Sequence, residues 1–248
     1  MNAILSKVSQ QSDAPQLRIA SYNLQKCIGL DLRRRPDRSL NVIDALEADI
    51  TVLQEADKRL PPRPSAIPRQ LIDHHGWKVV PFGHSAMVKG GSLGWHGNAM
   101  LLRPMVEVLQ TSQIELPGLE PRGAIRADLE TSIGQVRVIG VHLGLLRRHR
   151  IQQLLAITRM IRTLEPMPTI VVGDFNEWGT ISALDASTPG LRFLNPGASF
   201  PALRPLAHLD RFALSDELKV NDCGVFTMRP APIASDHLPI WATLRMAR

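Results

Sequence analysis

The sequence predicts an α/β (α+β) protein in which two packed β-sheets are covered by helices on the outside. Short apolar, β-branched segments of strand length recur along the 248 residues, and each is closed by Gly, Pro, Asn or Asp. Three helical segments interleave with them, too irregularly for a doubly wound sheet or a barrel of repeating βα units. No repeat or composition shift divides the chain, so we expect one domain over residues 16–248.

The predicted strands are the segments in which apolar and β-branched residues gather. They cover residues 17–22, 50–53, 77–82, 98–102, 123–130, 135–141, 169–172, 209–214 and 237–244. Between them, the Pro-rich segment 60–68 and the Gly-rich segment 83–97 are predicted to be surface loops.

Three helices are predicted, at residues 37–46, 65–74 and 147–164. The first carries Leu40, Ile43 and Leu46 at three-residue spacing, which gives it one apolar face. The third has a basic first turn, which opposes the helix dipole. Its arginines, at positions 147, 148 and 150, therefore either face an anion or form a solvated basic surface.

The charge balance favours an anionic partner. Lys and Arg number 29 against 23 Asp and Glu, a net charge of +6. Most of the cations are arginines, whose planar fork suits bidentate phosphate contacts, although ordinary surface charge gives the same balance. Aromatic residues make up only 4% of the chain, which argues against stacking platforms for single-stranded bases.

The cellular setting is predicted from what the sequence lacks. Cys27 and Cys223 cannot form a disulfide framework, although a single bridge between them stays open, and they indicate a reducing compartment. Residues 1–15 lack the apolar run of a signal peptide and are expected to be a mobile leader. No segment approaches the roughly 20 apolar residues of a membrane span. We therefore expect a cytoplasmic protein without stable membrane insertion.

Polar residues stand at the ends of five predicted strands. After a strand, a lone Asp or Asn is usually a turn residue, but several strands that end at one rim bring such residues together. Carboxylates and amides are the oxygen ligands that Mg²⁺ prefers. The candidates are Asn23, Glu55, His142, Asp174, Asn176, Asp236 and His237.

Other chemistries find no support in the sequence. No GxxxxGK loop is present for nucleoside triphosphates, and no GxSxG motif or reactive-cysteine setting for covalent catalysis. Two histidines without thiolate partners argue against a structural zinc site. Metal-assisted hydrolysis with imidazole acid/base groups remains.

The order of motifs resembles one family. SYNLQ, LQEAD, HGNAMLL, VHL, GDFNE, LDRFALS and SDHLPI follow each other between residues 17 and 244, as in the endonuclease/exonuclease/phosphatase family. The resemblance implies a four-layered α/β sandwich, two packed mixed β-sheets flanked by helices. It also implies an Mg²⁺- or Mn²⁺-dependent phosphoesterase.

The resemblance further implies which residues bind the metal. Glu55 would be the principal ligand, with Asn23 assisting and Asp236 supporting the metal region. Asp174 and Asn176 would hold the attacking water and a phosphate oxygen.

Histidines complete the implied site. His237 would contact the scissile phosphate or move a proton, with its ring oriented by Asp210. His142 would be a second catalytic histidine, where repair enzymes of the exonuclease III kind usually have Tyr. Asn98 would lie near the phosphate and bind substrate, and His96 is a weaker candidate for the same place.

The favoured function is a phosphodiesterase or endonuclease that acts on nucleic acid, because neutralising backbone phosphates drives sequence-independent binding. The first alternative is hydrolysis of a phospholipid headgroup or of a small phosphate ester. The second is a non-catalytic module that binds anions. The motifs leave open endo- or exonucleolytic action, one or two metal ions, the general base and the oligomeric state.

Overall fold

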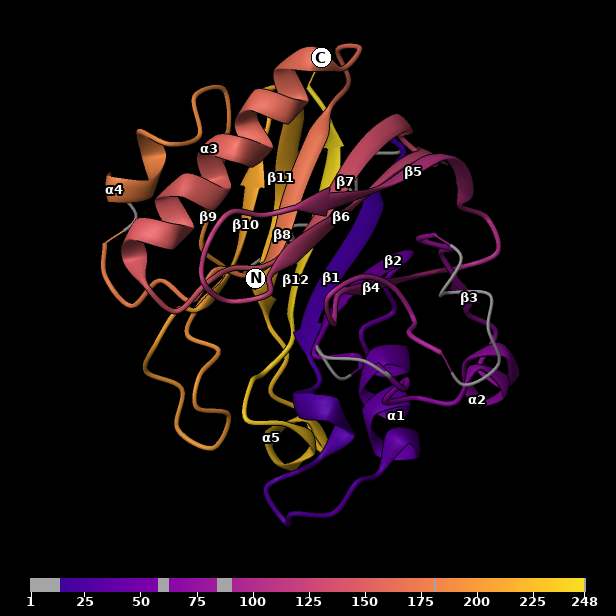
Figure 1. Ribbon diagram of the computed structural model, residues 1–248. Coiled ribbons are helices and arrows are strands. Elements are labelled where there is room, and N and C mark those ends of the chain that lie inside the picture. Colours follow the sequence, from indigo (N-terminus) through magenta and orange to yellow (C-terminus); the bar gives the residue numbers. More distant parts are fainter. Residues whose placement is uncertain (1–13, 58–62, 84–90, 181, 248) are drawn as a thin grey trace, which may run out of the picture.

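The computed structural model describes residues 14–57, 63–83, 91–180 and 182–247. Two six-stranded mixed sheets pack face to face, with helices on their outer faces (Figure 1). Of the expected leader at residues 1–15, all but the last two residues lie outside the described part of the chain. The expected layering of sheets and helices is confirmed.

The first sheet combines strands from both ends of the chain. Its order is β11 (Leu218–Val225), β12 (Ile240–Met246), β1 (Leu17–Asn23), β2 (Ile50–Gln54), β4 (Ala99–Leu102) and β3 (Lys78–Val79). β1 and β2 are parallel, whereas the other neighbours are antiparallel.

The second sheet is built from the middle of the chain. Its order is β5 (Glu107–Glu115), β6 (Gly123–Thr131), β7 (Gly134–His142), β8 (Thr169–Asp174), β10 (Asp210–Leu214) and β9 (Arg192–Leu194). Here β7 and β8 are the parallel pair.

The main core lies between the two sheets. Alternate side chains of a strand point to opposite faces, so Ile19 of β1 and Val52 of β2 pack against Val138 of β7 and Val172 of β8. The remaining side chains of these strands face the helices. Because both faces are buried, the central strands read as continuous apolar segments rather than as alternating ones.

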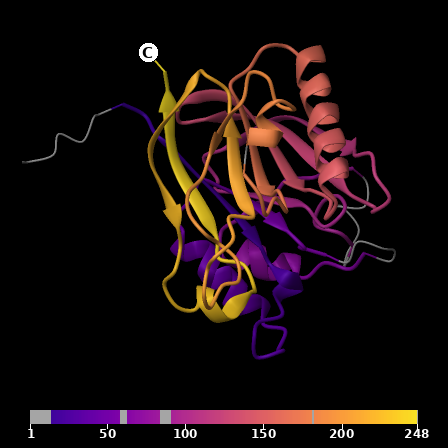
Figure 2. The same cartoon turned by 90° about the vertical axis from the view of Figure 1, so that its left-hand side faces the viewer.

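Helices cover the outer faces. α1 (Pro36–Ala45), α2 (Arg69–His74) and α5 (Ala231–Ala234) belong to the first sheet's side, where α1 contributes Leu40 and Ile43 to the outer core. α3 (Arg147–Thr163) lies along the outer face of the second sheet (Figure 2), and α4 (Ser182–Asp185) follows β8. No helix in the described residues is long and apolar enough to cross a membrane.

Several predicted boundaries were wrong for local reasons. The helix predicted over 65–74 begins only at Arg69, because Pro68 keeps the residue before it out of helical conformation. The strand predicted over 237–244 begins at Ile240, because Pro239 has no N–H for the ladder. The strand predicted over 77–82 is reduced to Lys78–Val79. In their described parts, the loops predicted over 60–68 and 83–97 contain no helix or strand.

The two thiols are not bridged. Cys27 is buried at the end of η1 (Gln25–Cys27), and Cys223 is half-buried on β11. Both are free.

The topology gathers many loops at one end of the sandwich. We call it the carboxyl end, because the parallel strands β1, β2, β7 and β8 all finish there. The antiparallel strands β4, β6, β10 and β12 begin at the same end. Every polar strand end noted in the sequence therefore faces this end.

Candidate active site

The register of the second sheet aligns three titratable residues. His142 ends β7 opposite Asp174 at the end of β8, and Asp210 at the start of β10 is also opposite Asp174. All three side chains are buried. Neighbouring strands thus carry an imidazole and two carboxylates in one row.

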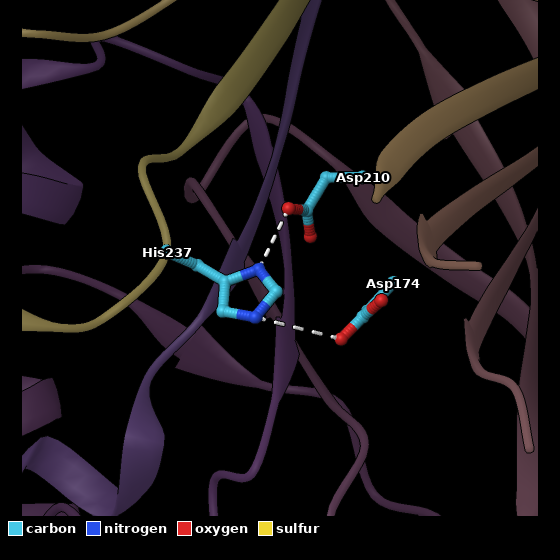
Figure 3. A group of neighbouring side chains, drawn as sticks. All are labelled: Asp174, Asp210 and His237. Atoms are coloured by element: carbon cyan, nitrogen blue, oxygen red, sulfur yellow. Dashed lines mark hydrogen bonds and ion pairs between the residues drawn. The ribbon is translucent and has the colours of Figure 1, made fainter. Parts of the chain in front are cut away.

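His237 reaches this row from the first sheet's side, in the segment before β12. Its Nδ1 lies 2.8 Å from Oδ2 of Asp210, and its Nε2 lies 3.8 Å from Oδ2 of Asp174 (Figure 3). Ser199 donates its hydroxyl to the same oxygen of Asp210 at 2.6 Å. Since a carboxylate only accepts, Nδ1 of His237 carries a proton and Nε2 is the atom left to act on a substrate.

Opposing influences set the pKa of His237. Burial lowers it, because a charged ring loses water. The charge and hydrogen bond of Asp210, together with the charges of Asp174 and Asp236, outweigh this effect, and the result is a pKa of about 10. The ring is therefore an imidazolium at neutral pH.

Asp174 is the meeting point of the two sheets. Asn23, which ends β1, donates from Nδ2 to Oδ2 of Asp174 at 3.1 Å, and Nε2 of His142 lies 3.5 Å from the same oxygen. The backbone N–H of Asn176 donates to Oδ1 at 2.9 Å. Burial raises the pKa of Asp174 to about 6, and the charge of His237 opposes that rise.

The backbone beside Asp174 is specialised. At Gly173 (φ +150°) a Cβ would lie 2.0 Å from the carbonyl oxygen of Val141, so only glycine fits. Asn176 has a φ of +52°, a left-handed conformation that asparagine tolerates, and its Nδ2 donates to the carbonyl of Leu143 at 2.9 Å. Because Nδ2 is used in this bond, the amide oxygen is the side-chain atom of Asn176 that can make other contacts. The backbone geometry of the GDFN motif thus fixes the positions of the Asp174 and Asn176 side chains.

Glu55 follows β2, next to the end of β1. The backbone N–H of Leu24 donates to Gln54 and that of Lys26 to Glu55, which ties the two strand ends together. Glu55 also adopts a left-handed φ of +51°. Its carboxylate forms an ion pair with Nζ of Lys26. A cation is therefore already favourable beside Glu55.

Asp236 and Asn98 flank this arrangement. The backbone N–H of Asp236 donates to Oε1 of Gln25 at 3.1 Å, and its half-buried carboxylate accepts from Ser235 at 3.3 Å. Buried Asn98 donates from Nδ2 to the carbonyls of Gly123 at 2.8 Å and Trp95 at 3.3 Å. These bonds suit anchoring of the segment before β4 better than donation to a phosphate.

Comparison with known proteins now identifies the family. The model of the endonuclease/exonuclease/phosphatase family matches residues 20–237. The chain belongs to this family. Among curated proteins, the uncharacterized protein YbhP of Escherichia coli (strain K12) is 27% identical over 180 residues, which cover 68% of this chain and 70% of YbhP.

Solved structures of other members share the fold. D. rerio TDP2 complexed with a single-strand DNA product has a TM-score of 0.70 at 16% identity, over 93% of this chain and 99% of TDP2. The Bacteroides thetaiotaomicron mannosyl-6-phosphatase Bt3783 has a TM-score of 0.69 at 18% identity, over 94% of this chain and 100% of Bt3783. These similarities confirm the four-layered sandwich that the motif order implied.

The donors at the carboxyl end fit the divalent cation that family membership suggests. Within the described residues, Asp174, Asp210 and His237 form a group whose ligand atoms all lie within 4.8 Å of one another. This group differs from the predicted trio of Asn23, Glu55 and Asp236. Carboxylate and amide oxygens of both sets are hard ligands, and the Lys26 pair shows that Glu55 accepts a neighbouring cation.

Some participants carried no signal in the sequence. Ser199 lies in a loop without a motif, yet it bonds to Asp210. Phe200 packs its ring 4.9 Å from that of His237. Of the basic turn that begins α3, Arg150 is buried and binds Glu177 at 3.0 Å, whereas Arg148 is exposed. Arg147 also lies 3.7 Å from Glu177, so two arginines of that turn face an anion, but it is the protein's own.

Proposed function

We propose that this protein is a hydrolase of phosphodiesters that depends on a divalent cation, Mg²⁺ or Mn²⁺. The observation that carries the proposal is the chain of contacts from Asp210 through His237 to Asp174. It brings an imidazolium and two carboxylates together where Asn23 joins the second sheet to the first. Such a constellation can neutralise charge on a phosphate and orient a water molecule.

The metal would be held by Glu55, with Asn23 assisting and Asp236 close by. When bound, the cation would neutralise charge that builds on the phosphate. The pairing of Lys26 with Glu55 supports the assignment, because a cationic side chain already lies beside this carboxylate.

His237 would donate from Nε2 to a phosphate oxygen, while Asp210 fixes the ring and keeps it charged. His142 would act as the second imidazole, since its Nε2 also lies near Oδ2 of Asp174. Asp174 and the amide oxygen of Asn176 would orient the attacking water. For Asn98 we propose a place near the phosphate, where its main effect would be to hold the segment before β4.

Nucleic acid is the first candidate substrate. The net charge of +6 supports it, since cations that replace counterions drive binding to a phosphate backbone. TDP2, with which the chain shares its fold, was solved with a single-strand DNA product. The action would be that of a phosphodiesterase or endonuclease.

A phospholipid headgroup or a small phosphate ester is the second candidate. One observation favours it, namely that large apolar side chains are exposed on loops at the carboxyl end. A non-catalytic anion-binding module, the remaining alternative, would bind such ligands without hydrolysing them.

A substrate panel tests the proposal. Plasmid DNA, single-stranded oligonucleotides, bis-p-nitrophenyl phosphate and phospholipid vesicles would each be incubated with the protein and Mg²⁺ or Mn²⁺, and with Asp174→Ala in parallel. We expect at least one phosphodiester to be hydrolysed only by the unchanged protein. Hydrolysis that persists equally in Asp174→Ala, or none with any ester, would contradict the proposal.

A further inference from the structure

Exposed apolar side chains are concentrated at one end of the molecule. Thirteen large apolar residues in the described part of the chain are more than a third exposed. Three of them, Met105, Val108 and Leu109, lie on β5 or just before it. Nine of the other ten lie in loops at the carboxyl end, around the candidate active site, and the tenth, Ile233, lies in α5 at the same end.

Six separate loops contribute to this surface. Strand register places residues 24–35, 116–122, 143–146, 175–180, 195–209 and 226–239 all at the carboxyl end. One strongly exposed apolar residue from each, between 63% and 86% exposed, forms what we call the apolar rim: Leu32, Leu119, Leu145, Trp178, Leu203 and Met228.

The apolar rim is continuous with the site. Trp178 packs edge-on against Phe200, with ring centroids 5.7 Å apart, and Phe200 lies 4.9 Å from the ring of His237. Whatever covers Trp178 is therefore two side chains away from the imidazole that would act on the phosphate.

The same loops carry positive charge. In three of them an exposed apolar residue is followed directly by an exposed arginine, at Leu32–Arg33, Leu203–Arg204 and Met228–Arg229. Within the described residues of the six loops, Asp31 is the one exposed carboxylate, and it is bound by Arg38 at 2.8 Å. The rim is thus both apolar and cationic.

We propose that the apolar rim docks this protein on an anionic phospholipid bilayer, with the active site facing the headgroups. Leucine, methionine and tryptophan side chains gain by entering the interface, and each arginine beside them is attracted to anionic lipid. Nucleic acid fits less well, because exposed leucines gain nothing from a phosphate backbone and Trp178 is the rim's one aromatic. Docking itself does not require the proposed function. The substrate class does rest on the proposed function, and it would be a phospholipid phosphodiester.

Vesicle sedimentation in EDTA tests docking without hydrolysis. Vesicles of phosphatidylcholine alone would be compared with vesicles that also contain phosphatidylglycerol. We expect the protein to sediment with the anionic vesicles, and the double variant Leu203→Ser/Met228→Ser to bind them at least about tenfold more weakly. Met105→Ser removes a side chain that is 71% exposed outside these loops and serves as the matched control. It should bind like the unchanged protein.

The results that would contradict docking differ from those that would contradict the proposed function. Equal binding to both vesicle types, full binding by the double variant, or an equal loss in Met105→Ser would overturn the docking surface. So would binding of single-stranded or duplex DNA that the double variant loses, in the absence of vesicle binding. Since sedimentation requires no turnover, an inactive protein that still docks would contradict the proposed function and leave the docking surface supported.

Discussion

Nδ1 of His237 lies 2.8 Å from Oδ2 of Asp210, although the two residues are held by different sheets. Asp210 begins β10 in the second sheet, whereas His237 precedes β12 in the first. Their contact exists only when the two sheets are packed together. It turns Nε2 of His237 toward Asp174 and thereby connects the packing of the core to the chemistry of the site.

The first prediction concerns this carboxylate. Asp210→Asn removes the charge that keeps His237 protonated, so turnover should fall by about 10²–10³, as for loss of one charge-stabilising group. The rate should also decline at a lower pH than in the unchanged protein. Ser199→Ala, which removes one neutral hydrogen bond to Asp210, should cost only a few-fold. Equal losses in both variants would argue against a charge effect.

The second prediction is a pH dependence of stability in metal-free protein. The pKa of His237 rises from 6.5 to about 10 on folding. Its stabilising contribution is therefore complete below pH 6.5 and lost as the pH rises through 10. His237→Asn should lower the free energy of unfolding most near pH 6, by about 2 kcal/mol or more, and much less near pH 10. Urea titrations in EDTA would measure this, and a difference that stays constant across that range would contradict it.

Asp174 should show the opposite sign. Its pKa is raised from 3.8 to about 6, so its charged form is disfavoured in the folded protein. The resulting penalty acts above pH 6 and disappears as the pH falls below 3.8. Asp174→Asn should accordingly gain stability relative to the unchanged protein between pH 4 and pH 8 in the same urea titrations. A relative loss over that interval would show that the carboxylate is not destabilised by burial.

The third prediction concerns the metal. Glu55→Gln should raise the Mg²⁺ concentration needed for half-maximal activity by at least about 10–100-fold, the range known for outer-shell partners. Thermal unfolding gives a second readout, because a bound ion raises the midpoint. In thermal unfolding, Lys26→Met should lower the Mg²⁺ concentration needed to raise the midpoint, since it removes a cation that competes for the same carboxylate. Unchanged Mg²⁺ dependence in both variants would remove Glu55 from the site.

The fourth prediction concerns stability outside the site. Asp128 of β6 is buried and binds both Arg126 and Arg137, which are also buried. Asp128→Ala would leave two guanidinium groups without their carboxylate, and should lower the free energy of unfolding by about 3–5 kcal/mol. Glu107→Ala, an exposed carboxylate on β5, should stay within about 0.5 kcal/mol. Similar effects in the two variants would contradict a stabilising role for the buried ion pairs of Asp128.

The sequence predicted the central strands well, because their signal is local. β1, β2, β7 and β8 are buried on both faces and therefore appear as short apolar segments. β5 was missed, since the strand at the sheet's edge is largely exposed and its sequence, EVLQTSQIE, has no apolar alternation. β11 was missed for a related reason, because polar residues and a bulge after Val220 interrupt its pattern. Edge strands owe their conformation to pairing with a neighbouring strand rather than to an apolar pattern of their own.

The sequence predicted that some candidate residues would meet, but not the contacts that they make. Polar residues after apolar strands indicated Asn23, His142 and Asp174, and these three do meet. Ser199 gave no signal, because its loop is brought to Asp210 only by tertiary structure. The pairing of Lys26 with Glu55 was equally invisible, since it depends on left-handed backbone at both residues. Residue types reveal candidates, whereas partners are set by packing.

Hydrolysis of bis-p-nitrophenyl phosphate tests the central claim most directly. The rate would be measured with Mg²⁺ and in EDTA for the unchanged protein, His237→Ala and the control Met105→Ser. We predict hydrolysis that requires Mg²⁺, falls by about 10²–10³ in His237→Ala and is unaffected in the control. A rate that survives EDTA, or one that His237→Ala retains in full while folded, would contradict a metal-dependent phosphodiesterase centred on His237 and Asp174.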